Sequence, residues 1–123
     1  MNKRLLVSPI THAVLFAAFI FLLSSVPNPL VLGSLDLNDK IKHVLLYSAF
    51  SFLVARAVAV RERRPWRVAV WTIVLVALYG ASDEYHQRFT PGRSCDILDW
   101  VADASGAVLV SLTLPFWFRR RKD

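Results

Sequence analysis

Residues 66–82 read WRVAVWTIVLVALYGAS, the most continuous apolar stretch in the chain. A helix over this stretch would lack the polar stripe of Lys and Glu that amphipathic helices of soluble bundles present to water. A chain of 123 residues is also too short to enclose such a helix on every side within a soluble core. We therefore predict that this stretch crosses a membrane as a helix.

Three further apolar segments flank this one, at residues 10–26, 41–60 and 97–118. The first is slightly shorter than the ~20 residues of a typical span but lies within the usual range. A cleaved signal peptide is the rival interpretation of that segment, because Lys3 and Arg4 precede it, but no A-x-A cleavage site follows. The sequence thus predicts an all-α, polytopic membrane protein with four transmembrane helices, forming a single domain over the whole chain.

The charged residues are segregated along the chain, although 55% of all residues are hydrophobic and the net charge is +6. Eleven of the 15 Lys and Arg residues lie in the two tails and around the connection between the second and third segments. The positive-inside rule places these parts in the cytoplasm, so both termini are predicted to be cytoplasmic. Short basic runs between apolar blocks are typical of loops facing an anionic leaflet, and we predict no nucleic-acid binding.

The other side of the predicted bundle carries seven of the nine acidic residues. Its polar residues concentrate where the second segment begins, the third ends and the fourth begins. Spacings of three and four place them on one face of each helix. Because these three helix ends lie on the same side of the membrane, we expect their polar faces to meet at one depth. The candidate ligand-binding residues are Lys40, His43, Tyr47, Glu84, Gln87, Arg93, Asp99 and Asp103.

Ionisable groups near the centre of a membrane helix cost about 2.5–3.5 kcal/mol each on insertion scales. They are therefore expected to face the bundle interior and to pair with one another. Arg93, Lys40 and His43 are the cations available for pairing. Pro91 and Gly92 suit positions i+1 and i+2 of a type II turn, which could fold Arg93 back over the acidic residues.

Three motifs together resemble the VanZ-like family of small bacterial membrane proteins. They are D-K-x-x-H-x-x-x-Y at Asp39–Tyr47, G-x-x-D-E-x-H-Q-x-F-x-P-G-R-S at Gly80–Ser94 and D-W-x-A-D-x-x-G at Asp99–Gly106. One departure is Asp103, where many relatives have Asn. The family is named after an accessory factor of glycopeptide-resistance clusters that lowers teicoplanin susceptibility. The resemblance implies a location, the bacterial cytoplasmic membrane, and not a reaction or a role in resistance.

The polar cluster suggests a pocket between the second, third and fourth helices that binds the head group of an envelope lipid or a lipid-linked envelope precursor. Lys40, His43 and Arg93 would contact its phosphate or carboxylate, with Arg93 suited to a bidentate contact. Two alternatives stay open: an intramembrane enzyme that acts on a lipid-linked substrate, and a structural or partner protein of the cell envelope. Four spans make a thin bundle, which is consistent with a homodimer.

For the enzyme alternative, Glu84, His43 and Asp99 could act as general acid and base or hold a divalent metal. However, the chain has no H-E-x-x-H motif, no G-x-S-x-G motif and no metal-spaced pair of histidines on one helix. The sequence therefore predicts no cofactor and no metal site, and it assigns no catalytic residue.

Overall fold

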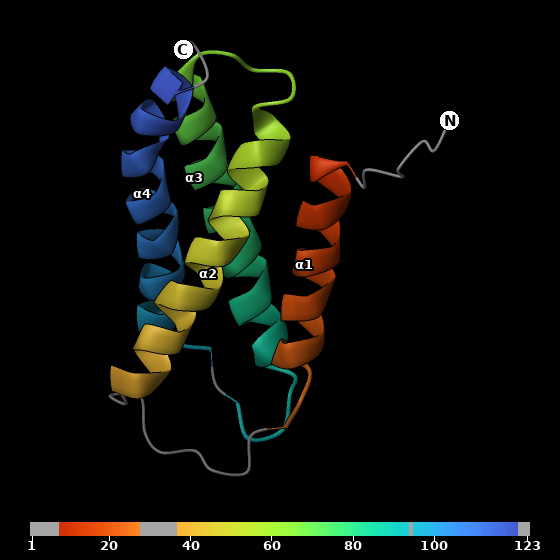
Figure 1. Cartoon of the computed structure of the whole chain (residues 1–123). Helices are drawn as coiled ribbons and strands as arrows, with labels where there is room; N and C mark the ends of the chain where they lie inside the picture. Colours follow the sequence, from red (N-terminus) through yellow and green to blue (C-terminus); the bar gives the residue numbers. More distant parts are fainter. Residues whose placement is uncertain (1–7, 28–36, 94, 121–123) are drawn as a thin grey trace.

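A computed structural model describes residues 8–27, 37–93 and 95–120 of the chain, in which four helices alternate in direction (Figure 1). The helices are α1 (Pro9–Ser24), α2 (Leu37–Val58), α3 (Pro65–Gln87) and α4 (Ile97–Arg120), and these ranges contain no strand. At one end of the bundle, α1 begins, α2 connects to α3, and α4 ends (Figure 1). We call the opposite end, where α1 and α3 finish and α2 and α4 begin, the polar end.

The lengths and composition of the helices confirm the all-helical membrane architecture. Residues Asp39–Val58 of α2, the whole of α3 and the whole of α4 are long and apolar enough to cross a membrane. α1 is also apolar but has only 16 residues, which reach about 24 Å at 1.5 Å per residue. The structure thus has three helices of spanning length and one shorter apolar helix beside them.

Local sequence explains where α1 and α3 begin. Ser8 caps α1, since its side-chain oxygen accepts the Thr11 backbone N–H at 3.2 Å. Proline occupies the first turn of both helices, at Pro9 and Pro65, where its missing N–H would have no helical partner in any case.

Two helices extend further at the polar end than the sequence predicts. α2 begins at Leu37, four residues before the predicted start, and α3 continues to Gln87, five residues past the predicted end at 82. The extension of α3 is polar but stays within the bundle, because Asp83, Glu84 and Gln87 are buried against neighbouring helices. Hydropathy alone ends the helix too early for this reason.

The apolar core lies between the helices, and the outer surface of the bundle is also apolar. Tyr47, Phe50 and Val76 are buried in the main core cluster. Outward-facing residues such as Leu78 and Leu112 are 65% and 67% exposed. Exposed apolar side chains on every helix suit a surrounding of lipid tails and would be unfavourable in water.

α4 packs against both α2 and α3, whereas α1 packs mainly against α2. Gly106 permits the contact between α4 and α2, since a Cβ atom at this position would lie 2.9 Å from both the Ser48 backbone nitrogen and the Val44 carbonyl oxygen. Small residues allow close approach of membrane helices in this way. The close contact at Gly106 is therefore one between two helices of the same chain.

Candidate functional site

An ion-pair cluster joins α2 to the start of α4 at the polar end. Lys40 of α2 donates to Asp96 at 3.0 Å and to Asp99. Asp96 also accepts the Leu98 backbone N–H at 2.9 Å, as a residue at a helix N-terminus often does. This backbone N–H and the Lys40 ammonium both favour the carboxylate, so the pKa of Asp96 lies below its ordinary value.

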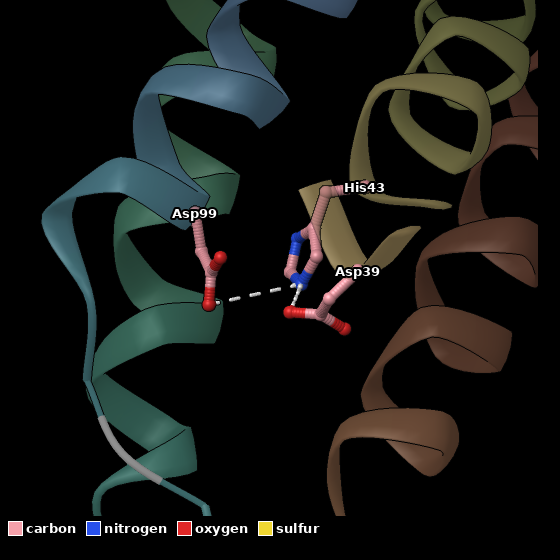
Figure 2. A group of neighbouring side chains, drawn as sticks. All are labelled: Asp39, His43 and Asp99. Atoms are coloured by element: carbon pink, nitrogen blue, oxygen red, sulfur yellow. Dashed lines mark ion pairs between the residues drawn. The ribbon is translucent and has the colours of Figure 1, made fainter. Parts of the chain in front are cut away.

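His43 lies one turn further along α2 and contacts three acidic residues. Its Nδ1 is 2.7 Å from Oδ1 of Asp103, which is completely buried on α4. Its Nε2 lies between the carboxylates of Asp39 and Asp99, 3.9 Å from an oxygen of each (Figure 2). The two nitrogens of one imidazole ring are thus directed at carboxylates from both α2 and α4.

Glu84 brings α3 into the same cluster. One of its oxygens accepts the backbone N–H of Asp96 at 3.1 Å. Its other oxygen, Oε1, and Oδ2 of Asp103 are buried and have no hydrogen-bond partner among the described residues. A ligand atom from each of His43, Glu84 and Asp103 lies within 4.8 Å of the other two. We call these three residues the inner cluster.

A second polar chain links α2, α3 and α1. The Tyr47 hydroxyl donates to Asp83 Oδ2 at 2.9 Å, inside the bundle. The Gln87 amide lies 3.4 Å from the same oxygen and 3.4 Å from the Ser24 hydroxyl at the end of α1. The Thr90 hydroxyl then donates to the Ser24 carbonyl at 3.1 Å. These bonds position the loop after α3 against the end of α1.

The predicted type II turn is present, but Arg93 does not reach the acidic residues. Gly92 has a φ of 74°, and the Arg93 backbone N–H donates to the Thr90 carbonyl at 3.1 Å. The Arg93 guanidinium donates instead to the carbonyls of Val26 at 3.0 Å and Leu23 at 3.3 Å. The end of a helix has carbonyls without helical partners and a partial negative charge, so it attracts this cation.

A cleft of about 280 Å³ opens at the polar end between α1, α2 and α3. Its polar lining consists of Ser24, Asp39, Lys42, His43, Tyr47, Asp83, Gln87 and Arg93. The sequence predicts a pocket between α2, α3 and α4 instead. In that region Lys40 pairs with Asp96 and Asp99, and His43 pairs with Asp103.

All eight predicted site residues lie at the polar end, but in different surroundings. Lys40, His43, Asp99 and Asp103 form ion pairs between α2 and α4, and Glu84 of α3 accepts the Asp96 backbone N–H beside them. Tyr47, Gln87 and Arg93 border the cleft, which His43 also lines. The predicted set of ligand-binding residues does not include Asp39, Lys42, Asp83 and Asp96, which line the cleft or join the ion pairs. Asp83 was detectable, because it lies three residues after Gly80 and four before Gln87 on the same buried face of α3.

A comparison with known families decides what kind of protein carries this arrangement. The model of the VanZ/LLP1 family matches residues 7–118. The chain belongs to the VanZ/LLP1 family. No match was found among curated proteins or among solved structures. The family match and the helices of spanning length make the chain a VanZ/LLP1 membrane protein, and the three motifs of this family member converge at its polar end.

Proposed function

We propose that this VanZ/LLP1 protein binds the head group of an envelope lipid in the cleft at the polar end. The observation that carries the proposal is the lining of the cleft, which combines two cationic side chains, Lys42 and Arg93, with a buried oxygen of Asp83 that has no partner in the described part of the chain. A phosphate next to a hydroxyl or ammonium group matches both features.

Lys42 and Arg93 would bind the phosphate. Arg93 is held at the wall of the cleft by hydrogen bonds to the carbonyls of Leu23, in the last turn of α1, and Val26, just after the helix. A guanidinium has five N–H groups, so others remain for phosphate oxygens. Lys42 is exposed on α2 and supplies a second charge with a flexible stem. This assignment replaces Lys40, which is engaged with Asp96 and Asp99.

Asp83 would bind the other half of the head group. Its Oδ2 accepts the Tyr47 hydroxyl, whereas its Oδ1 is buried without a partner among the described residues. Leaving such an acceptor unsatisfied costs about 1–3 kcal/mol, more for a charged group. A hydroxyl or ammonium donor from a ligand would remove this penalty. Asp39, on the same cleft, adds a second acceptor.

The cleft also has a route for acyl chains. Leu23, in the last turn of α1, and Val26, just after the helix, line it and are 41% and 55% exposed. With the basic tails and the α2–α3 connection in the cytoplasm, the polar end would face the outer leaflet of the bacterial cytoplasmic membrane. Both glycerophospholipids and lipid-linked envelope precursors carry phosphate at that depth, so both are candidate ligands.

Native mass spectrometry of the detergent-purified protein tests this proposal. The probes are phosphatidylglycerol, phosphatidylethanolamine, a polyprenyl phosphate and, as a lipid without phosphate, diacylglycerol. We expect at least one phosphate-bearing lipid to be retained at least fivefold over diacylglycerol. Preference for the first two over polyprenyl phosphate would identify a phospholipid, and the reverse a lipid-linked precursor.

Two matched substitutions locate the binding. Lys42→Gln is expected to reduce retention several-fold without lowering stability, because Lys42 is exposed. Arg63→Gln removes an exposed charge at the opposite end and should leave retention unchanged. Equal retention of all four lipids, or equal losses in the two variants, would show that the cleft does not select a phosphate head group.

A further inference from the structure

The inner cluster brings three metal-ligating side chains from three helices together inside the bundle. His43 comes from α2, Glu84 from α3 and Asp103 from α4. Their ligand atoms lie within 4.8 Å of one another. Ligands of a tetrahedral ion with bonds near 2.1 Å are about 3.4 Å apart, so modest side-chain rotations complete such a shell.

Both carboxylates of the inner cluster have an oxygen without a hydrogen-bond partner in the part of the chain that the structure describes. Glu84 is 3% exposed and Asp103 is 0% exposed, and Oε1 of the former and Oδ2 of the latter accept no hydrogen bond from the described residues. Most buried polar atoms in proteins are hydrogen-bonded, and an exception calls for an explanation such as an ion. Two carboxylates with such acceptors, each offering a ligand atom within 4.8 Å of an imidazole nitrogen, fit a bound cation.

The charges of the inner cluster also favour a bound cation. Glu84 has no cationic partner among the described residues, and Asp103 pairs only with His43 there. Lys40 cannot supply the missing charge, because it pairs with Asp96 and Asp99. Burying unpaired carboxylates in apolar surroundings is expensive, and a divalent cation would neutralise two of them at once.

We propose that His43, Glu84 and Asp103 bind one divalent transition-metal ion, with Zn²⁺ as the best match. One imidazole and two carboxylates form a mixed nitrogen and oxygen ligand set, which suits Zn²⁺ or Mn²⁺ better than the all-oxygen sites of Ca²⁺. Three protein ligands leave a fourth position open for water or a substrate atom, as in catalytic zinc sites.

The surroundings of His43 favour a metal ion at Nδ1 over a metal ion at Nε2, next to Asp39 and Asp99. If Nδ1 binds the metal, Nε2–H is directed at Asp39 and Asp99, each 3.9 Å away (Figure 2). Carboxylates behind a ligating histidine orient the ring and raise its basicity. Asp39, His43 and Asp99 form a second metal-like group, but Lys40 is bound to Asp99 and would repel a dication there.

Metal binding can be measured directly on the full chain, purified in detergent and treated with a chelator. We expect elemental analysis after re-loading with ZnCl₂ to give one Zn²⁺ per chain, and Co²⁺ to give visible absorption of a bound ion. His43→Gln, Glu84→Gln and Asp103→Asn keep the side-chain shapes and should each weaken binding at least tenfold. His86→Gln and Asp96→Asn, at the same end of the bundle, should not.

Chemical modification of the wild-type protein provides a second test, which does not depend on whether the variants fold. Diethylpyrocarbonate modifies accessible histidines, and mass spectrometry reports each position. Zn²⁺ should slow modification of His43 several-fold and leave His12 and His86 unaffected. Absence of stoichiometric metal in the wild-type protein would overturn the proposal, as would binding that survives Glu84→Gln and Asp103→Asn but is lost in Asp39→Asn. These measurements use no lipid, so they stand independently of the head-group proposal.

Discussion

Replacing Gly106 by alanine should destabilise the bundle through one specific contact between α4 and α2. The added Cβ would lie 2.9 Å from the Ser48 nitrogen and 2.9 Å from the Val44 carbonyl oxygen, both backbone atoms. An ordinary contact begins near 3.4 Å, so the two helices must separate by roughly 0.5 Å. Overpacking of this kind typically costs about 1–3 kcal/mol. Because the obstructing atoms are backbone, no side-chain rotation relieves the contact.

Gly80→Ala is the matched control for this substitution. A Cβ at position 80 would meet Asp103 side-chain atoms at 3.4 Å, which is an ordinary contact. Alanine also favours a helix over glycine by about 0.8–1 kcal/mol in water, so this variant should be neutral or slightly stabilised. Both variants gain the same methyl group and the same helix preference. Their difference therefore isolates the contact of α4 with α2.

Thermal unfolding in detergent, followed by a thiol-independent fluorescence probe or circular dichroism, measures both variants. Gly106→Ala should melt at a clearly lower temperature than Gly80→Ala, corresponding to at least about 1 kcal/mol. Equal melting temperatures would refute the close approach of α2 and α4, and with it the placement of His43 against Asp103. Those two residues face each other across the same helix pair.

Three further substitutions or conditions test the polar network. Tyr47→Phe should lower the free energy of unfolding by about 1–3 kcal/mol, because Asp83 loses its buried hydroxyl donor; Tyr79→Phe, whose hydroxyl donates to α1, is the comparison. Lys40→Met leaves two acidic residues without their cation and should lower the melting temperature at pH 7. The pKa of Asp96 is lowered by the Leu98 N–H and the Lys40 ammonium, so its stabilising effect is present above pH ~4 and lost as the pH falls further. Asp96→Asn should therefore flatten the pH dependence of the melting temperature in that acidic range.

The architecture could be predicted from the sequence because membrane burial is a property of whole segments. A helix without charged residues, such as residues 68–82 would form, has no soluble alternative in a chain of this length. The ends of the helices were harder to predict. Residues 83–87 are polar but remain helical, since their hydrogen bonds and buried contacts come from α1, α2 and the start of α4. Such partners are invisible to a hydropathy pattern.

The gathering of the candidate residues at one end of the bundle could also be predicted, whereas their pairing could not. Spacings of three and four place Lys40, His43 and Tyr47 on one face of α2. They do not say which cation meets which acid. Arg93 was expected to fold over the acidic residues, but it is bound to the carbonyls of Leu23 and Val26 at the end of α1 and just after it. That choice depends on where α1 ends in space, which no local pattern encodes.

His43 connects the two proposed sites, so single substitutions must be chosen with care. It lines the cleft and also belongs to the inner cluster. A change at His43 would therefore affect head-group and metal binding together and could not assign either. Lys42 lines the cleft but is not part of the inner cluster, and Asp103 is part of the inner cluster but does not line the cleft. If Lys42→Gln changes only lipid retention and Asp103→Asn changes only metal content, the polar end contains two separate sites that share His43.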